Sequence, residues 1–588
     1  MEKNDRLIKN TFKGILIVNM LSIVSSIATV MIDAIITGQF LGSDAVASMG
    51  LINPVVMIFN LVGALFGPGL GIVCTRYMGM AKRDRVVQVF SLVMITMVSI
   101  ALLAVFVLFF SAPQLGRVLG ARTNDPTIIS MVSDYLKGYS FGIPFFLLSL
   151  ALGGLMMLDN DRKLGLTAVF VTLIADTVFD LLNVLVFHGG MGGMAVATSL
   201  SNALGLFTLL THFRKKDRIL HFRPSNLNPR DLKDVVLYSV PSAISTGSNA
   251  IRNLCFNTLI LAIATKVEVS ALSINNSSFS IVVAFTLAFN VTTSTLCSLY
   301  FGEEDKKRIE TSFKLSIKNI LKVFGVLAVL LLIFAGMVAK LFLRSGNMAE
   351  LATATFFIRC TVIQYLLMCV SYSLSGAYQG TGRLGFNYLL VILREMVFPI
   401  ISVVALGKLF GVRGIGFGFI VSGVLTLLSC FLLPAIVNKK IPEKADDFLL
   451  LKDDFGARPE DTFEVSVSDK DQAADASVGV MEFYRRHGAE RRTTMFMSLF
   501  LEEVLNNTIE YGYPDNEEKN IDVRVIYGKE SQTIRIRDNG KPFDPVEWYN
   551  KNHPEDQSSG LGIRMIMELA KDVRYIPALN MNNLMLTF

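Results

Sequence analysis

Charged residues are scarce in this sequence of 588 residues: Asp, Glu, Lys and Arg make up 18% of it, whereas about a quarter is typical of soluble globular proteins. Hydrophobic residues account for 52%. The sequence also lacks the Gly-x-x-x-x-Gly-Lys-Ser/Thr motif that cradles nucleotide phosphates in P-loop proteins. These features indicate a membrane protein and argue against a pump driven by a P-loop ATPase.

Cysteine motifs are absent as well. The six cysteines all fall in apolar stretches and form no Cys-x-x-Cys or Cys/His spacing, so we expect neither a zinc site nor a disulfide framework. We interpret them as buried packing residues. They are Cys74, Cys255, Cys297, Cys360, Cys369 and Cys430.

Charge is divided unevenly along the chain. Residues 1–440 carry a net charge of about +16 and residues 458–588 about −7. The first part is apolar and the second is polar. Two physically different modules are therefore joined near residue 440.

The first module contains about twelve runs that could cross a bilayer, since a spanning helix needs about twenty mostly apolar residues. They divide into two sets of six, which predicts lobes at 1–220 and 221–440, a linker at 441–460 and a soluble domain at 461–588. The first set is Ile15–Ile36, Leu51–Cys74, Val86–Phe110, Ile129–Met157, Leu164–Phe187 and Met191–Leu210. The second set is Val235–Thr265, Ser270–Leu299, Phe313–Leu341, Leu351–Tyr378, Leu384–Ala405 and Ile415–Val437.

Basic residues gather in alternate loops, at Lys82–Arg85, Arg214–Arg218 and Lys306–Arg308. The opposite loops hold only scattered single charges. Because positively charged loops stay on the cytosolic side, we expect a multi-pass protein of the plasma membrane with both termini in the cytosol. This topology accounts for the basic clusters, so we expect no nucleic-acid binding.

The two sets of spans repeat each other at an offset of about 220 residues, as an internal duplication predicts. Six helices per set restart the second half on the same side of the membrane, so we expect parallel repeats about an axis along the membrane normal. The matched positions are Tyr77 and Tyr300, Gly79 and Gly302, Arg162 and Arg383, and Gly193 and Gly414.

The stretch from Met31 to Gly42 reads Met-Ile-Asp-Ala-Ile-Ile-Thr-Gly-Gln-Phe-Leu-Gly and continues to Pro54. It resembles the first-helix signature of the multidrug and toxic compound extrusion (MATE) transporters, and the resemblance covers roughly residues 10–440, with both repeats. It implies two six-helix lobes around a central cleft, alternating access, and export of small organic cations or amphiphiles in exchange for protons or sodium.

Three carboxylates of the first set are candidates for a function: Asp33 in the first span, and Asp176 and Asp180 in the fifth. A charge at the centre of a spanning helix costs about 2.5–3.5 kcal/mol on insertion scales, so one that persists there usually has a function. Asp176 and Asp180 are four residues apart and share a helix face. The MATE resemblance makes Asp33 and Asp180 coupling carboxylates. The structural alternative is that these acids pair with an internal arginine or cap a kinked helix.

The second set of spans departs from that pattern. Its seventh and tenth spans contain Arg252 and Arg359, and only the eleventh supplies an acid, in Arg394-Glu395. Glu395 is expected to pair with Arg359 or Arg394. Two internal arginines would suit an anionic group, which weakens the expectation that the substrate is a cation.

The soluble part alternates strands and helices over about 130 residues, a usual domain size. Its period-2 and helical patterns give the element bounds. We expect strands at Phe463–Val467, Ile521–Ile526, Thr533–Arg537, Val573–Ile576 and Leu584–Phe588, and helices from a cap at Ser468 or Asp469 to about Arg485, at Thr494–Tyr511 and at Leu561–Leu569.

Three motifs lie on this frame. Glu503 and Asn507 are one helical turn apart; the amide oxygen of Asn507 suits magnesium, which prefers oxygen ligands, and Glu503 could accept a proton. Asp538 ends a strand, where its carboxylate can accept from an adenine amine, while Gly540 lets the backbone approach. The third motif, Gly560-Leu561-Gly562, opens a helix whose amides can hold phosphate.

In order and spacing the three motifs resemble the N, G1 and G2 boxes of the GHKL ATPase superfamily, closest to the anti-sigma-factor serine kinases. The resemblance implies an α/β sandwich that binds ATP and magnesium. Magnesium would lie on Asn507, Asp538 would read adenine, and Glu503 would be the catalytic base. Residues 545–559 would form a lid, and the remaining nucleotide-binding positions would be Gly540, Gly560, Leu561 and Gly562.

The sequence therefore predicts a cation-coupled antiporter that exports small organic compounds. Its cytosolic domain would bind ATP and either regulate transport or phosphorylate a serine on an anti-anti-sigma-like protein partner. The alternative is a membrane sensor whose transporter-derived lobes control the kinase output. A transporter with an inert nucleotide-binding relic is a third possibility.

Overall fold

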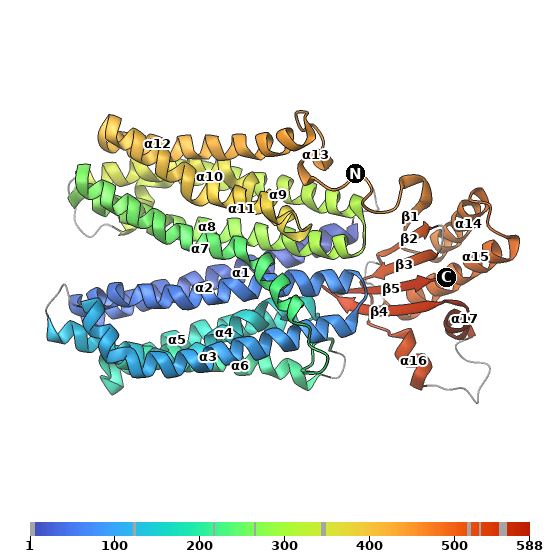
Figure 1. Ribbon diagram of the computed structural model, residues 1–588, viewed down its shortest axis with the longest axis horizontal. Helices are drawn as coiled ribbons and strands as arrows, with labels where there is room; N and C mark the ends of the chain where they lie inside the picture. Colours follow the sequence, from blue (N-terminus) through green and yellow to red (C-terminus); the bar gives the residue numbers. More distant parts are fainter. Residues whose placement is uncertain are drawn as a thin grey trace.

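The computed structural model describes the chain apart from residues 1–5, 121–124, 216–217, 264–265, 343–347, 514–518, 529–530 and 552–560. A long helical bundle, α1 to α12, makes up most of the molecule, and an α/β domain lies against one end of it (Figure 1). We call this end of the bundle the domain end and the opposite one the far end.

The bundle consists of two helix sets, which we call the first and second lobes. The first lobe has α1 (Arg6–Ile36), η2 (Thr37–Leu41), α2 (Ser43–Gly79), α3 (Arg83–Gly120), α4 (Pro126–Leu158), α5 (Arg162–Leu182), η3 (Asn183–Phe187), α6 (Gly190–Leu210) and η4 (Thr211–Arg214). The second lobe has α7 (Pro229–Ile263), α8 (Lys266–Gly302), α9 (Lys306–Phe342), α10 (Met348–Gly380), α11 (Leu384–Ile392), η5 (Leu393–Val397) and α12 (Phe398–Asn438).

Within the described residues, 10 helical runs are long and apolar enough to cross a membrane, fewer than the twelve expected. The many Ser and Asn residues of α7 keep it below that threshold. Leu384–Asn438 counts as one run of 55 residues. At about 1.5 Å per residue, that length is more than twice a hydrocarbon core of about 30 Å. The run bends at Gly411, where φ is 62°, so it supplies the predicted eleventh and twelfth spans.

The lobes pack against each other through α2 with α7 and α8, and through α1 with α8. Gly79 and Gly302, at matched positions of the repeat, allow the closest approach at the domain end. A Cβ atom on Gly79 would lie 2.1 Å from the carbonyl oxygen of Leu299, and one on Gly302 would lie 2.2 Å from that of Arg76. Any larger side chain there would separate the lobes at the domain end.

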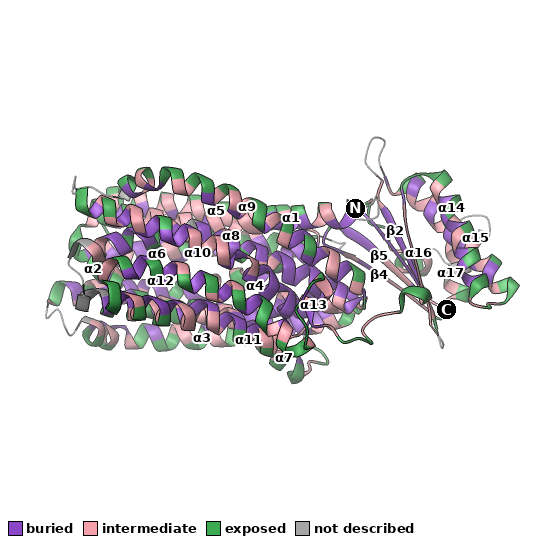
Figure 2. Ribbon diagram, turned by 90° about the horizontal axis from the view of Figure 1, so that it is seen from above, coloured by how far each residue is buried: buried purple, intermediate pink, exposed green. Residues whose placement is uncertain are grey.

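The C-terminal domain is a five-stranded antiparallel sheet in the order β1-β2-β3-β5-β4. Helices cover the sheet face that points away from the bundle, and the bundle lies against the other face (Figure 2). Buried residues such as Val480, Leu501 and Ile534 form the core between sheet and helices. The strands are β1 (Thr462–Val467), β2 (Ile521–Tyr527), β3 (Gln532–Asp538), β4 (Asp572–Ala578) and β5 (Met581–Thr587), and the helices are α14 (Lys470–Arg486), α15 (Arg491–Tyr511), α16 (Pro545–Lys551) and α17 (Leu561–Leu569).

All strands and helices predicted for this domain are present, and their bounds differ from the predicted ones by at most about three residues. Asp469 is the cap of α14, where its side chain accepts from the backbone N–H of Gln472 at 2.8 Å. The additional helix α16 begins the stretch that we predicted as a lid. The rest of that stretch, residues 552–559, lies outside the described residues.

The segment between bundle and domain is attached to the second lobe. It contains α13 (Ala445–Leu449), whose Phe448 packs edge-on against Phe431 of α12 with ring centroids 5.5 Å apart. Asp446 forms an ion pair with Lys306 at 2.8 Å. The chain therefore reaches the domain along the surface of the second lobe.

Candidate transport and nucleotide sites

Three aspartates meet inside the first lobe. Asp33 comes from α1, and Asp176 and Asp180 come from α5, which packs against α1. Carboxylate oxygens of the three lie within 4.8 Å of one another, and Asp176 and Asp180 are buried. The structure thus brings together residues that the sequence could place only on separate spans.

The surroundings of these aspartates do not neutralise them. Ser201 of α6 donates a hydrogen bond to Oδ1 of Asp176 at 2.7 Å. Both oxygens of Asp180 and Oδ1 of Asp33 are buried, and among the described residues they have no donor from outside the triad. Carboxylates this close repel one another strongly in an apolar interior. The arrangement is therefore suited to take up protons or a metal cation.

The second lobe contains a different polar cluster. Glu395 of η5 lies between Arg252 of α7, with Oε2 3.2 Å from Nη1, and Arg394, with Oε1 2.9 Å from Nε. Tyr372 of α10 donates to Oε1 of Glu395 at 3.0 Å, and the Arg394 guanidinium lies over its ring. Of the two predicted partners of Glu395, Arg394 is correct, whereas Arg359 is exposed on α10. Arg252 was missed as a partner.

In the C-terminal domain, Asp538 is held at the end of β3. It accepts from the backbone N–H of Gly540 at 2.8 Å and from Nδ2 of Asn582 at 2.7 Å. Burial raises the pKa of Asp538 to about 6, although the bonds from Asn582 and Gly540 act in the opposite direction. The carboxylate is thus a buried hydrogen-bond acceptor that is fixed at the end of β3.

Glu503 and Asn507 lie one turn apart on α15. Nδ2 of Asn507 donates to Oε1 of Glu503 at 3.0 Å. This bond uses the amide nitrogen of Asn507 and turns its oxygen, a ligand type that magnesium prefers, away from Glu503. The residues present therefore fit the predicted ion.

Gly540 brings the loop after β3 against the end of α15. A Cβ atom there would lie 2.6 Å from the carbonyl oxygen of Gly512, and that same oxygen accepts from the N–H of Lys541 at 2.6 Å. The absence of a side chain at this position thus joins the loop of Asp538 to the helix of Asn507. Gly560 lies outside the described residues, and Leu561 and Gly562 are described only as the start of α17.

Two residues that support Asp538 were not predicted. Asn582 of β5 donates to Asp538 and to the carbonyl oxygen of Gly540 at 3.1 Å, and its own oxygen accepts from Tyr575 at 2.8 Å. Tyr575 in turn accepts from the N–H of Phe543 at 3.0 Å. The sequence offered one signal, since Asn582 and Asn583 interrupt an otherwise apolar strand.

A protein-family model described as MatE matches residues 15–182 and 241–404, more than half of the chain. The chain belongs to the MatE family. A second family model, the histidine kinase-like ATPase domain, matches residues 466–588. This MatE protein is therefore a multi-pass membrane protein with a C-terminal domain of a kind that binds ATP, and both predicted resemblances are confirmed.

Known relatives cover the membrane part of this MatE protein. The multidrug export protein MepA of Staphylococcus saprophyticus is 20% identical over 440 residues, which are 74% of this chain and 95% of that protein. The outward-facing structure of a multidrug resistance MATE family transporter has a TM-score of 0.68 at 18% identity, over 75% of this chain and 98% of that one. A MOP superfamily transporter from Pyrococcus furiosus, described as having a binding pocket of reverse polarity, has a TM-score of 0.64 at 19% identity, over 74% and 99%. These structures establish the fold.

The ATPase domain meets the second MatE lobe through charged side chains. Glu303 and Asp305, in the turn between α8 and α9, have 0% of their side-chain surface exposed. Arg537 of β3 binds both carboxylates, Arg535 lies 3.2 Å from Glu303, and Arg524 of β2 lies 3.1 Å from Asp305. Breaking one such buried pair leaves an uncompensated charge. The sheet and this turn therefore form one structural unit.

The pKa values of the interface groups also indicate that the sheet and the turn after α8 form one unit. Burial alone would raise the pKa of Asp305, but Arg524, Arg308 and Arg537 hold it below its ordinary value. Burial lowers the pKa of Arg535 to about 10. Arg308 of α9 binds Asp522 of β2 at 2.9 Å, so both sides contribute acids and arginines.

The domain meets the first lobe mainly through the backbone. Arg535 donates to the carbonyl oxygen of Gly79 at 2.9 Å, so this one side chain contacts both lobes. The N–H of Leu579 donates to the carbonyl oxygen of Leu158 at 3.2 Å, and that of Asn580 to Oδ1 of Asn160 at 2.5 Å. Fewer of these contacts involve charged side chains than is the case for the contacts to the second lobe.

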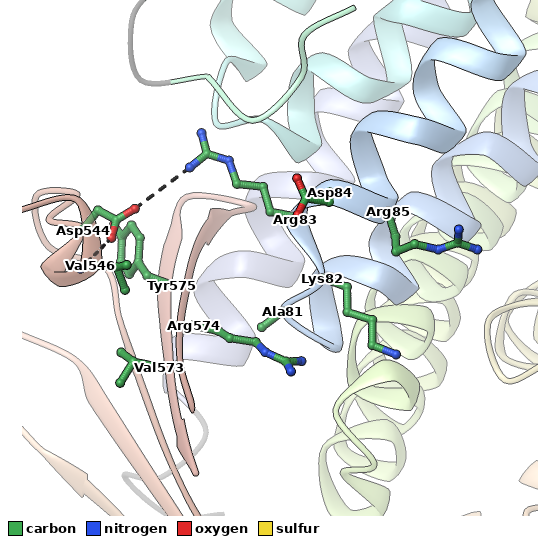
Figure 3. A pocket seen from close by; sticks show the side chains of 10 residues that line it. All are labelled: Ala81, Lys82, Arg83, Asp84, Arg85, Asp544, Val546, Val573, Arg574 and Tyr575. Atoms are coloured by element: carbon green, nitrogen blue, oxygen red, sulfur yellow. Dashed lines mark hydrogen bonds and ion pairs between the residues drawn. The ribbon is translucent and has the colours of Figure 1, made fainter. Parts of the chain in front are cut away.

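A cavity of about 530 Å³ lies beside these contacts, between the turn after α2 and β4. Figure 3 shows Arg83 reaching across it toward Asp544, with the two charged groups 4.0 Å apart. Arg574 lies below, and its Nη1 donates to the carbonyl oxygen of Met80 at 3.4 Å. The first lobe is thus less tightly packed against the domain than the second.

Proposed function

We propose that this protein is an antiporter that exports small organic compounds in exchange for protons or sodium, and that its C-terminal domain is a cytosolic regulator or serine kinase. The transport part rests on one observation: Asp33, Asp176 and Asp180 meet in the first lobe. MatE family membership and relatives named as multidrug export proteins support it. The basic loops at the domain end support a plasma-membrane protein with both termini in the cytosol.

The triad provides a way to couple a cation to movement of the lobes. Each proton or sodium ion taken up reduces the repulsion among the three carboxylates, and each one released restores it. Asp33 lies on α1, which also packs against α8 of the second lobe, where Nδ2 of Asn19 donates to Thr292 at 3.1 Å. A change in the charge of the triad therefore reaches the boundary between the lobes.

Asn507, Glu503 and Asp538 would hold ATP and magnesium in the C-terminal domain. The amide oxygen of Asn507 would ligate the ion, which when bound neutralises phosphate charge. Asp538 would accept from the adenine amine, and Glu503 is placed to accept a proton from a water or a hydroxyl.

Regulation of transport by this domain follows from where it docks. Its sheet contacts the turns of both lobes at the end where Gly79 and Gly302 pack together. Opening the cleft at that end would separate the two turns, so a domain bound to both would oppose opening. Any rearrangement of the sheet on nucleotide binding would then change the rate of transport.

A sensor that controls a kinase output is the second candidate, and one observation favours it. Arg537, which binds Glu303 and Asp305 of the second lobe, is followed directly by Asp538 of the nucleotide pocket. A ligand that shifts the second lobe would thereby shift Asp538. An anti-anti-sigma-like protein would be the phosphorylated partner in this case.

The test is efflux from proteoliposomes that contain the full-length protein, with ethidium as an organic cation and an imposed proton or sodium gradient. Replacing Asp33 by Asn removes one carboxylate without changing its shape. We expect gradient-driven efflux to fall below about a tenth of the wild-type rate, because an intramembrane acid of this kind carries the coupling charge. Asp134→Asn, at an exposed position on α4, is the matched control. Normal efflux by Asp33→Asn would contradict the assignment.

A further inference from the structure

The Arg252–Glu395–Arg394 cluster occupies the place in the second lobe that the aspartate triad occupies in the first. At the repeat offset of about 220 residues, Asp33 corresponds to Arg252 and Asp176 to Glu395, each to within a few positions. The packing repeats too, because α1 lies against α5 as α7 lies against α11 and η5. One site has therefore been built twice, with acids in one copy and mainly arginines in the other.

The second copy carries more positive than negative charge. Glu395 is the acid that Arg252 and Arg394 share, and the other bonded side chains, Tyr372, Asn249 and Ser371, are neutral. An ion pair that served only to stabilise the helices would need one arginine for this carboxylate. A second guanidinium within the bundle adds an uncompensated charge, which is costly in a membrane interior. An anion from outside the cluster would offset that cost.

Arg252 is the most exposed member of the cluster. The side chain of Arg252 is 19% exposed, whereas those of Arg394 and Glu395 are 3% and 5% exposed. Arg252 lies on α7, which packs against α2 of the first lobe, so the exposed guanidinium lies on a helix at the boundary between the lobes. Its Nη1 binds Glu395 and its Nη2 binds Asn249, while its Nε–H has no partner among the described residues.

The local backbone agrees with a binding role. Arg394 and Glu395 lie in η5, a π-helical turn inside the α11–α12 run, and such turns are frequent at functional sites because they redirect side chains. Tyr372 and Arg394 hold the Glu395 carboxylate from the opposite side. The position of Arg252 is thus fixed before a ligand arrives.

We infer that Arg252 binds an oxyanion group, a carboxylate or a phosphate, of the compound that the protein transports. A guanidinium presents parallel N–H donors that match the geometry of such a group. Arg394, Glu395 and Tyr372 position Arg252 and leave the net positive charge that attracts the anion. This inference rests on the proposed transport function and adds compounds with an acidic group to its expected substrates.

Binding of two dyes with the same ring system tests this inference: fluorescein, which carries a carboxylate, and rhodamine 123, a cation in which that carboxylate is esterified. Fluorescence anisotropy with the purified full-length protein at pH 8 gives Kd for each dye. We expect saturable binding of fluorescein that Arg252→Gln weakens about 10- to 100-fold, as loss of a hydrogen bond to a charged group does. Arg252→Lys keeps the charge and should give an intermediate Kd.

Arg359→Gln is the matched control, since Arg359 is exposed on α10 and away from the cluster; its Kd for fluorescein should equal that of the wild type. In Arg252→Gln, Glu395 retains its bonds to Arg394 and Tyr372, so we expect this variant to fold. Nucleotide binding by its C-terminal domain checks that it does. Unchanged fluorescein affinity in Arg252→Gln, or no saturable fluorescein binding by the wild type, would overturn the inference. Binding without transport under any gradient would instead contradict the proposed function.

Discussion

The two lobes of the bundle have corresponding helices but opposite charge at corresponding places. In the first lobe, Asp33, Asp176 and Asp180 lie within 4.8 Å of one another, and no cationic side chain of the described residues is bonded to them. In the second, Glu395 is balanced by Arg394 and Arg252. The helix packing that creates a buried polar site was therefore kept after duplication, while the charge placed in it was not. This difference in charge underlies the two proposals, a cation at the first site and an anionic group at the second.

The lobes also differ in how they contact the ATPase domain. Glu303 and Asp305 of the second lobe are enclosed by arginines of the sheet, whereas the first lobe offers mostly carbonyl oxygens, such as that of Gly79. Buried ion pairs are costly to break singly, while one neutral hydrogen bond contributes about 0.5–1.5 kcal/mol. The domain is therefore bound strongly to the second lobe, whereas its contacts with the first lobe are weaker and easier to break.

Of the substitutions considered, one at Glu303 should have the largest effect, because it weakens the stronger contact, that between the domain and the second lobe. Glu303→Gln leaves Arg535 without its carboxylate and Arg537 with Asp305 alone, and loss of one partner of a buried pair costs about 3–5 kcal/mol. We expect the domain to detach from the bundle, which would be measured as rapid proteolysis of residues 441–460 and a lower Tm.

Asn160→Ala is the comparison on the first lobe, because it removes the acceptor for the N–H of Asn580. It should cost about 1 kcal/mol and leave the segment resistant to protease. Equal effects of the two substitutions would show that the domain is held evenly by both lobes.

Replacing Asn507 tests whether nucleotide binding changes the weaker contact, the one between the ATPase domain and the first lobe. Loss of a residue that supports a metal ligand typically costs about 10- to 100-fold in metal affinity, and we expect loss of the proposed ligand in Asn507→Ala to weaken magnesium-dependent ATP binding by at least about that factor. In the wild type, magnesium and ATP should change hydrogen exchange of residues 79–83 and 158–160 but not of residues 303–308. In the variant neither region should respond.

Efflux by the same variant separates the two candidate functions. A changed efflux rate supports a regulator of transport. Unchanged efflux together with lost phosphorylation of a protein partner supports the sensor. A response confined to residues 303–308 would contradict the asymmetry between the lobes.

The sequence predicted the parts of the molecule that depend on local pattern. Spans follow from apolar runs, and the places of Asn507 and Asp538 follow from short motifs with fixed spacing. It did not predict that Arg524, Arg535 and Arg537 lie at an interface. Arginines alternate along β2 and β3 with apolar residues, which is also the pattern of a sheet face in water. Their partners, Glu303 and Asp305, are more than about 200 residues away, and only the packing of the domain on the bundle brings them together.

The partner of Glu395 was predicted only in part for a related reason. Arg359 and Arg252 both lie within apolar spans, and hydropathy does not show which face of a helix points inward. The repeat is a better guide, since it places Arg252 opposite η5 as it places Asp33 opposite α5. Matched positions across the duplication therefore pair Arg252 with Glu395, whereas Arg359 has no counterpart among the three aspartates.

The pH dependence of nucleotide binding is the smallest expected effect, and it depends on Asp538. Burial raises the pKa of this carboxyl to about 6, so it is mostly ionised at pH 7.5 and about a quarter ionised at pH 5.5. Protonation weakens it as an acceptor for the adenine amine, and we expect ATP affinity to fall about three- to fourfold over this range. A raised pKa favours the protonated folded state, so this carboxyl alone does not unfold the domain in acid. Titration calorimetry of the wild type and Asp538→Asn at each pH checks this, because titration of the ATP phosphates affects both equally; the same pH slope in both would exclude Asp538 as the adenine acceptor.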